Sequence, residues 1–161
     1  MTYKILCLCL GNICRSPMAR AILESHLADA GLLESVSVDS AGTSAYHVGE
    51  PIDERAAMSL SQHGYASTDT ARQVRAEDLR DFQLILVMDT ANHADVLALG
   101  ANAGLPTDHV RLFRSFDPQA GPQAEVPDPY YGTPGGFDTV LRQLERASDG
   151  VVEFVRDEIA A

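Results

Sequence analysis

Hydrophobic positions along the 161-residue chain follow two patterns. Short apolar runs bounded by turn-forming residues predict buried strands, and apolar residues that recur every three or four positions predict amphipathic helices. Because the two patterns alternate, we expect an α/β fold with one domain over residues 1–161: a three-layer structure in which a central four-stranded parallel sheet is flanked by helices on both faces. The expected strands lie at 4–9, 36–39, 83–88 and 110–113, and the expected helices near 17–30, 53–63, 90–99 and 136–159.

The helix expected near the end of the chain has the clearest pattern. Gly150 falls within it and weakens the helix locally without having to break it. Before this helix, residues 115–136 are rich in proline and glycine, which exclude regular structure, and loops of that length in compact domains are usually functional or disordered. The apolar stripe of the helix is formed by Phe137, Val140, Leu141, Leu144, Val151, Phe154, Val155 and Ile159.

Composition narrows the classes of function. Twelve basic residues against 23 acidic ones give a formal net charge of −11, which argues against a broad nucleic-acid or anionic-membrane surface. A small anionic substrate held by a few local donors remains compatible with this charge. The apolar run 5–10 is too short to span a membrane and lacks the flanks of a secretion signal. Lys4 is the only lysine, and the Ala- and Arg-rich composition points weakly to a bacterial source.

Three cysteines, Cys7, Cys9 and Cys14, crowd into eight residues, unlike the spread of paired cysteines in a secreted disulfide framework. We therefore expect a reducing compartment, the cytoplasm. Cys7 lies two residues before Cys9 on the same strand face and is expected to belong to the core. No metal-ligand cluster stands out, and no metal or other cofactor is expected.

Residues 9–17 read Cys-Leu-Gly-Asn-Ile-Cys-Arg-Ser-Pro and lie where the first strand ends and the first helix begins. Ser16 is a favourable helix N-cap and Pro17 suits the first helical position, so the unpaired N–H groups of the helix start would form an anion site. Gly11 would let the loop turn sharply, and Asn12 would fix it by hydrogen bonds to the backbone. The segment thus predicts a nest of N–H groups around a phosphate.

Arg15 and Cys9 complete this loop. The planar guanidinium of Arg15 can hold two phosphate oxygens at once and stabilise charge gained in a transition state. The helix start, Arg15 and the hydroxyl of Ser16 would all favour the thiolate of Cys9. A thiolate beneath a bound phosphate is placed for in-line attack, which gives a cysteinyl-phosphate intermediate. A cysteine six residues before an arginine arises easily by chance, so the support for a phosphate-binding loop comes from the residues between Cys9 and Arg15.

The segment resembles the signature of the low-molecular-weight protein tyrosine phosphatases, and the resemblance covers nearly the whole chain. It implies hydrolysis of phosphotyrosine in protein substrates, with Cys9 as the nucleophile, Arg15 as the phosphate clamp and Asp128 as the general acid and base. The phosphate-binding loop would contain Leu10, Gly11, Asn12, Ile13, Cys14 and Ser16. Further segments in the family's order are D-S-A-G-T at 39–43, A-R-Q at 71–73, M-D at 88–89, S-F-D-P at 115–118 and D-P-Y-Y-G at 128–132.

Asp128 comes from the segment that carries the acid in this family. A carboxylic acid there would protonate the leaving tyrosyl oxygen, and the resulting carboxylate would activate the water that hydrolyses the intermediate. Pro127 and Pro129 would restrict the loop and orient the carboxylate. Asp117 also precedes a proline, but only Asp128 is followed by two tyrosines.

Aromatic residues are expected to form the walls of the substrate cleft. Tyr130 and Tyr131 would line one side, and the resemblance implies Tyr46 and His47 on the other, with Leu10 at the rim. A deep aromatic slot would favour the flat ring of phosphotyrosine over the shorter phosphoserine. Phosphorylation of the tyrosine pair itself, known in some relatives, is not predicted by the sequence.

Three further positions have two interpretations each. The resemblance implies that Cys14 forms a protective disulfide with Cys9 under oxidants, and a packed loop thiol is the alternative. Asp89 ends a strand, where α/β active sites collect, but an N-cap of the next helix is favoured. Many family members carry histidine where this chain has Asp69, which either points inward and brings negative charge to the loop or faces solvent. Ser40 would still contribute to this network.

Two rival functions were weighed. An arsenate reductase on the same scaffold needs further cysteines downstream for its disulfide relay, and no cysteine follows Cys14. A non-catalytic phosphate-binding adaptor is opposed by the intact Cys9, Arg15 and Asp128. Nucleotide-binding glycine motifs are absent from the sequence. We therefore predict a phosphotyrosine phosphatase and make no prediction of its oligomeric state.

Overall fold

The computed structural model describes residues 2–133 and 135–161. Residues 1 and 134, which belong to the predicted domain and the predicted 115–136 loop, lie outside the described residues. The described chain forms one parallel sheet in the order β2-β1-β3-β4, from β1 (Tyr3–Cys9), β2 (Val36–Gly42), β3 (Leu84–Val87) and β4 (Val110–Leu112). The helices are α1 (Arg15–Asp29), α2 (Glu54–Gln62), α3 (Asp78–Asp81), α4 (Thr90–Ala103), the short 3₁₀ helix η1 (Phe113–Phe116) and α5 (Gly135–Ala160).

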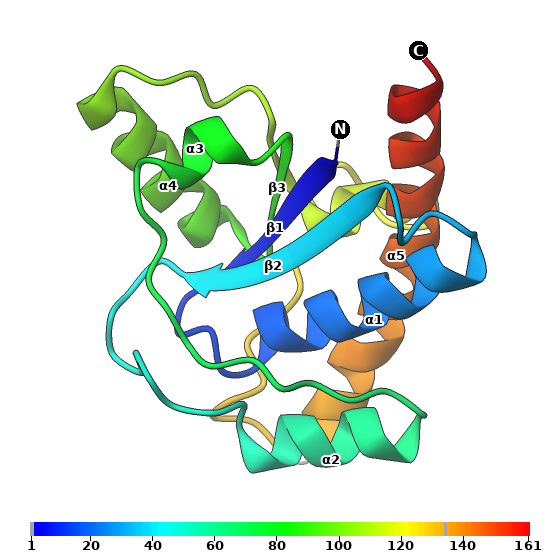
Figure 1. Ribbon diagram of the computed structural model, residues 1–161. Helices are drawn as coiled ribbons and strands as arrows, with labels where there is room; N and C mark the ends of the chain where they lie inside the picture. The colour runs from blue at the N-terminus through cyan, green and yellow to red at the C-terminus, as the bar shows by residue number, and fades with distance from the viewer. Residues whose placement is uncertain (1, 134) are drawn as a thin grey trace.

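Helices cover both faces of the sheet, which confirms the predicted α/β architecture. Figure 1 shows α1, α2 and α5 on one side of the strands and α3 and α4 on the other. Because successive side chains of a strand point to opposite faces, β1 contributes to two cores. Ile5 and Cys7 pack in the core with α1 and α5, whereas Leu6 and Leu8 pack in the core with α3 and α4. A strand buried on both faces produces the continuous apolar run seen in the sequence.

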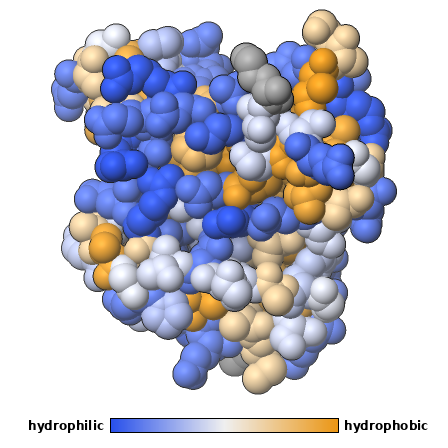
Figure 2. Space-filling view, viewed as in Figure 1, coloured by the Kyte–Doolittle hydropathy of each residue, from blue (hydrophilic) through white to orange (hydrophobic). Residues whose placement is uncertain are grey.

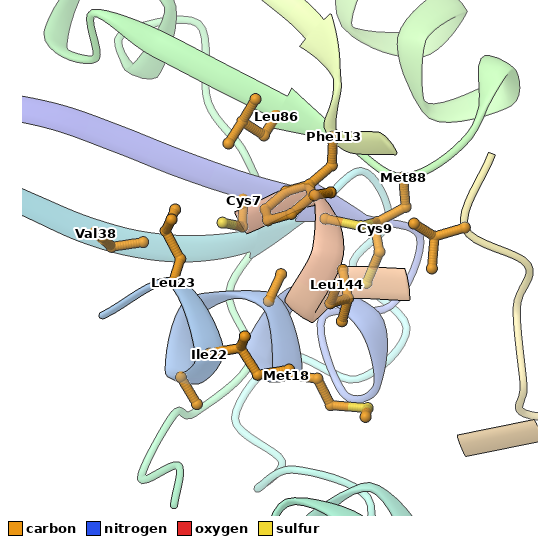
Figure 3. Close-up of a cluster of buried hydrophobic side chains, with 14 of the residues drawn as sticks. Cys7, Cys9, Met18, Ile22, Leu23, Val38, Leu86, Met88, Phe113 and Leu144 are labelled. Atoms are coloured by element: carbon orange, nitrogen blue, oxygen red, sulfur yellow. The ribbon is translucent and has the colours of Figure 1, made fainter. Parts of the chain in front are cut away.

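Cys7 and Cys9 lie on the same face of β1, as expected for residues two positions apart. Figure 3 shows them in the core on the α1 side, near Phe113 and Leu144. Cys7 is fully buried, which confirms that it belongs to the core. Cys9 is the last residue of β1 and therefore lies at the boundary between this core and the following loop.

Helix α1 begins two residues earlier than predicted. The prediction of Ser16 as its N-cap is wrong, because Cys14 occupies that position without a side-chain capping hydrogen bond. The hydroxyl of Ser16 instead lies 3.1 Å from the sulfur of Cys9. Pro17 is tolerated because it still lies in the first turn, where its missing N–H would have no intrahelical partner. The four-residue α3 and η1 were not predicted, since they are too short to show a period.

The face of the molecule seen in Figure 2 is mainly hydrophilic. Figure 2 shows hydrophilic side chains over most of the visible face, with smaller hydrophobic patches between them. Within residues 2–133 and 135–161, no helix combines the length and the apolar character that crossing a bilayer requires.

Helix α5 is continuous through Gly150, as predicted, and the structure explains the glycine. A Cβ atom added at Gly150 would overlap the main-chain carbonyl oxygen of Phe116 in η1. Because that atom belongs to the backbone, it cannot move aside as a flexible side chain would. The glycine therefore allows α5 to lie directly against η1, which compensates for its low helix propensity.

We expect Gly150→Ala to lower the free energy of unfolding by about 1–3 kcal/mol, although alanine favours helices, because the added methyl group overpacks this contact. Urea unfolding followed by circular dichroism measures the change. Gly136→Ala is the matched control in the same helix, since a Cβ atom there lies at an ordinary 3.6 Å from the Cβ atom of Pro129. A Gly150→Ala protein as stable as the wild type would contradict this account.

Candidate active site

A cleft of about 570 Å³ opens where β1 ends, and most of the predicted site residues line it. Asn12 and Ser16, which were also predicted for the loop, are buried behind the lining residues. The cleft thus joins residues from three separate parts of the sequence. Its lining consists of Cys9, Leu10, Gly11, Ile13, Cys14, Arg15, Tyr46, His47, Asp128, Tyr130 and Tyr131.

Cys9 presents its sulfur at the bottom of the loop. The backbone N–H of Asn12 donates a hydrogen bond to this sulfur at 3.3 Å, and the hydroxyl of Ser16 lies 3.1 Å away. On its other side Cys9 belongs to the buried core cluster, where Figure 3 shows it close to Met88. The rigid strand and its core contacts therefore hold the sulfur in one position facing the cleft.

Asn12, and not Gly11, provides the unusual backbone conformation of the loop. The φ angle of Asn12 is +57°, a left-handed value that asparagine tolerates better than most residues. Gly11 is needed for a different reason, since a Cβ atom there would lie 2.9 Å from Cδ2 of His47. The Asn12 side chain accepts a hydrogen bond from the backbone N–H of Arg72 at 3.0 Å. The loop is thus fixed by a distant segment as well as by its own backbone.

Arg15, the first residue of α1, is a buried cation with fixed partners. Its side chain is 3% exposed, and Nη1 donates to Oδ2 of Asp89 at 2.7 Å and to the carbonyl oxygen of Val126 at 3.0 Å. Nη2 lies 3.6 Å from Oδ2 of Asp128. Burial alone lowers the pKa of Arg15, but the charges of Cys9, Asp89 and Asp128 raise it above its ordinary value. The guanidinium therefore stays charged and held in place.

Asp89 has two roles, of which the sequence predicted one. Its Oδ1 accepts from the backbone N–H of Asn92 at 2.7 Å, and Oδ1 of Asn92 accepts from the backbone N–H of Asp89. This capping box confirms Asp89 as the N-cap of α4. The other oxygen binds Arg15, a role that sequence reasoning missed. Its position at the end of a strand was the only signal for that contact.

Asp128 reaches the cleft from the long loop before α5. Its side chain is 39% exposed, and Oδ1 accepts from the backbone N–H of Tyr130 at 3.0 Å, which fixes the carboxylate within a local turn. The loop is joined to the sheet by the backbone hydrogen bond from Val126 to Met88 at 2.7 Å. Asp117, in contrast, is buried and paired with Arg146 at 3.2 Å, away from the cleft.

Aromatic side chains form the walls, as the sequence predicted. The ring of Tyr130 lies 4.9 Å from the ring of Tyr131 in an edge-to-face arrangement and 6.3 Å from the ring of His47 across the cleft. Tyr46 and Tyr131 are both highly exposed, and Leu10 is partly exposed beside them. The mouth of the cleft therefore presents apolar surface to an incoming substrate.

Arg55 supports this wall, and sequence reasoning missed it. It lies in the first turn of α2, donates to the carbonyl oxygen of Tyr130 at 3.0 Å and is paired with Asp53 at 3.0 Å. Its guanidinium also lies over the rings of Tyr130 and Phe137, at 5.1 and 4.9 Å from their centroids. A single arginine at a helix start gave no sequence signal for these contacts.

The other two cysteines differ from Cys9 in their surroundings. Burial, with the charges of Asp53 and Cys9, raises the pKa of Cys14 to about 12. Burial raises the pKa of Cys7 well above its ordinary value. Both therefore remain neutral thiols near neutral pH. All three cysteines are free in the structure.

Asp69 points inward, so of its two interpretations the solvent-facing one is wrong. Its side chain is 8% exposed and accepts a hydrogen bond from the hydroxyl of Ser40. The second oxygen pairs with Nη1 of Arg20 at 3.1 Å. The carboxylate is thus brought towards the phosphate loop together with a compensating cation.

The cleft combines the parts needed to bind and transfer a tetrahedral anion. The start of α1 supplies backbone N–H groups, and Arg15 supplies a fixed positive charge. The sulfur of Cys9 lies beneath this anion site, and the carboxylate of Asp128 lies near the guanidinium at the open side. A thiol group and a carboxyl group therefore flank the position in which a phosphate would bind.

Comparison with known proteins agrees with this chemistry. The family model described as low molecular weight phosphotyrosine protein phosphatase matches residues 4–161. A low molecular weight protein-tyrosine-phosphatase of Streptomyces coelicolor is 42% identical, with 99% of this chain and 97% of that protein aligned. The human low molecular weight phosphotyrosine protein phosphatase is 38% identical, over 94% of this chain and 95% of its own length.

Solved structures show the same fold. A protein tyrosine phosphatase from Entamoeba histolytica superposes with a TM-score of 0.90 at 32% identity, covering 98% of this chain and 99% of that one. A Drosophila arginine phosphatase superposes with a TM-score of 0.86 at 30% identity, covering 94% and 96% of the two chains. Because the family model and the relatives span nearly its whole length, this chain belongs to the low molecular weight phosphotyrosine protein phosphatase family.

Proposed function

We propose that this protein hydrolyses phosphotyrosine in protein substrates, with Cys9 as nucleophile, Arg15 as phosphate clamp and Asp128 as general acid and base. The observation that carries the proposal is the convergence of these three side chains on one cleft. Family membership supports the reaction class, and the contacts of the three residues support their individual roles.

In the first step, the phosphate of the substrate binds to the N–H groups of the loop and to Arg15. The thiolate of Cys9 attacks phosphorus, a sulfur–phosphorus bond forms, and the bond from phosphorus to the tyrosyl oxygen breaks. Protonated Asp128 gives its proton to that oxygen, so tyrosine leaves as a neutral phenol. The guanidinium stabilises charge on the phosphoryl oxygens as they pass through the transition state.

In the second step, the carboxylate of Asp128 takes a proton from a water molecule, which attacks phosphorus. The sulfur–phosphorus bond breaks, inorganic phosphate forms and the thiolate of Cys9 is regenerated. One carboxyl group thus acts as acid and then as base, which returns the protein to its starting protonation state.

The walls of the cleft favour an aromatic phosphate ester. Ile13 and Tyr130, with Leu10 at the rim, offer apolar surface to a ring where the shorter phosphoserine would leave a gap. Phosphoarginine is the relevant competitor, since a structure of similar fold is described as an arginine phosphatase. Among the described residues that line the cleft, Asp128 alone is acidic, and the reaction uses it as the proton donor. We therefore propose phosphotyrosine over phosphoarginine.

We further propose one catalytic domain over residues 1–161 that works in the cytoplasm. The cluster of free thiols at Cys7, Cys9 and Cys14 supports a reducing compartment, where such thiols persist. The strongly acidic composition supports a soluble phosphoprotein partner over nucleic acid or an anionic membrane.

Steady-state hydrolysis of phosphotyrosine, phosphoserine and phosphoarginine peptides tests the reaction. We expect turnover of the phosphotyrosine peptide, its loss in Cys9→Ser, and a kcat about 10²–10⁴-fold lower in Asp128→Asn. The Asp128→Asn loss is expected to be smaller with p-nitrophenyl phosphate, whose leaving group needs less protonation. Asp117→Asn, the control aspartate before a proline, leaves kcat unchanged because Asp117 lies outside the cleft. Turnover that survives Cys9→Ser would contradict the mechanism.

Alkylation by iodoacetamide tests which cysteine is the nucleophile. With its pKa at about 12, Cys14 is ionised in only about one molecule in 10⁴ at pH 8, and burial raises the pKa of Cys7 well above its ordinary value. We expect one equivalent to be incorporated, at Cys9, with protection by inorganic phosphate, and none in Cys9→Ser over the same time. Labelling of Cys9→Ser at Cys14, located by mass spectrometric fragmentation, at the wild-type rate would refute this assignment.

A further inference from the structure

A chain of hydrogen bonds runs behind the phosphate loop from Asp69 to Cys9. The hydroxyl of Ser40 donates to Asp69 and accepts from Nδ2 of Asn12 at 2.9 Å. The same Nδ2 atom donates to the hydroxyl of Ser16 at 2.7 Å, and that hydroxyl lies 3.1 Å from the sulfur of Cys9. The middle members Asn12, Ser16 and Ser40 are all buried, so water does not compete for these bonds.

The carboxylate of Asp69 determines which group donates and which accepts in each hydrogen bond of this series. An ionised carboxylate only accepts hydrogen bonds, so the single proton of the Ser40 hydroxyl must point to Asp69. The lone pairs of Ser40 then face the amide of Asn12. The oxygen of that amide is bound by the backbone N–H of Arg72 at 3.0 Å, which leaves its NH₂ group to face both serines.

At the other end of the chain, Ser16 accepts from Asn12 and keeps one proton of its own. Two acceptors lie within reach of this proton: the sulfur of Cys9 at 3.1 Å and the carbonyl oxygen of Ala41 at 3.3 Å. A charged thiolate is the stronger acceptor of the two, so the proton turns to sulfur in the reactive form. The donor-to-acceptor direction fixed by Asp69 thereby extends through Ser40, Asn12 and Ser16 to the sulfur of Cys9.

Arg20 makes an acidic residue acceptable at this position. Its Nη1 lies 3.1 Å from Oδ1 of Asp69 and 3.2 Å from Oδ1 of Asp39, and its Nε lies 3.2 Å from Glu24. A negative charge brought towards the loop would oppose both the thiolate and a bound phosphate. Pairing with Arg20 offsets part of that charge while leaving the second oxygen of Asp69 to accept from Ser40.

We propose that Asp69, paired with Arg20, is a positioning residue that fixes the direction of the Ser40–Asn12–Ser16 chain and so turns the Ser16 proton towards Cys9. This inference rests on the proposed use of Cys9 as the nucleophile. Asp69 acts through other side chains and does not line the cleft.

Two readouts test the proposal: kcat and KM with p-nitrophenyl phosphate, and the rate of Cys9 alkylation by iodoacetamide. For Asp69→Ala we expect kcat and the alkylation rate to fall together by about three- to tenfold, the effect of one misdirected hydrogen bond, with KM nearly unchanged. Asp69→Asn keeps the shape and one acceptor oxygen, so we expect a smaller loss. The Asn variant also decides the matter if the Ala variant fails to fold.

A double-mutant cycle shows whether the effect passes through Ser40. Ser40→Ala and Asp69→Ala break the same link, so the double variant should be no slower than the slower single variant. Glu24→Gln is the matched control, since it removes a charge 3.2 Å from Nε of Arg20 and has no hydrogen bond to Ser40, Asn12 or Ser16. We expect this control to keep the wild-type kcat and alkylation rate.

The inference is overturned if Asp69→Ala and Asp69→Asn match the wild type in both readouts. It is equally overturned if the losses caused by the Ser40 and Asp69 substitutions multiply in the double variant, or if Glu24→Gln reproduces the loss. Because alkylation needs no turnover, the two proposals fail separately: a wild type without phosphatase activity refutes the proposed function, and the alkylation rates still decide the role of Asp69.

Discussion

The buried guanidinium of Arg15 is the interaction on which the site depends. A buried charge without partners is costly, so the fold must bring hydrogen-bond acceptors to it from several elements. Asp89 comes from the end of β3, Val126 and Asp128 come from the loop before α5, and Arg15 itself begins α1. The hydrogen bonds and ion pairs of Arg15 therefore bring the phosphate loop, the start of α4 and the loop that carries Asp128 together around one cleft.

The same cation explains how an acidic protein can bind an anionic substrate. The chain carries a formal charge of −11, so long-range attraction does not bring a phosphate to the cleft. Binding must come from short-range donors: the N–H groups at the start of α1 and the fork of Arg15. Asp128 is the most exposed carboxylate of the cluster around Arg15, and a bound phosphate can take its place beside Nη2.

Residues that do not line the cleft fix the position of its tyrosine wall and of its phosphate loop. Arg55 fixes the tyrosine wall by stacking on Tyr130 and binding its carbonyl oxygen, and Asp69 holds the back of the phosphate loop through Ser40. In both places a charged side chain is paired with a neighbour, Arg55 with Asp53 and Asp69 with Arg20. In each pair the partner offsets part of the charge that the supporting side chain brings near the cleft.

The sequence alone predicted the strands, the long helices and the phosphate loop with Cys9 and Arg15, because each depends on neighbours close along the chain. Asp128 was predicted from the family resemblance. The contact of Asp89 with Arg15, that of Arg55 with Tyr130 and the inward direction of Asp69 became visible in the folded chain alone, because the partners lie 74, 75 and 29 or more positions apart. The local sequence pattern also gave the wrong start for α1 and the wrong turning residue for the loop. Ser16 lies against the sulfur of Cys9 instead of capping the helix, and Asn12, which has the left-handed backbone, binds the distant Arg72. Periodicity and motifs depend on residues close together in the sequence, so they predict local structure. The long-range contacts form only when the parallel sheet brings the ends of its strands to one edge.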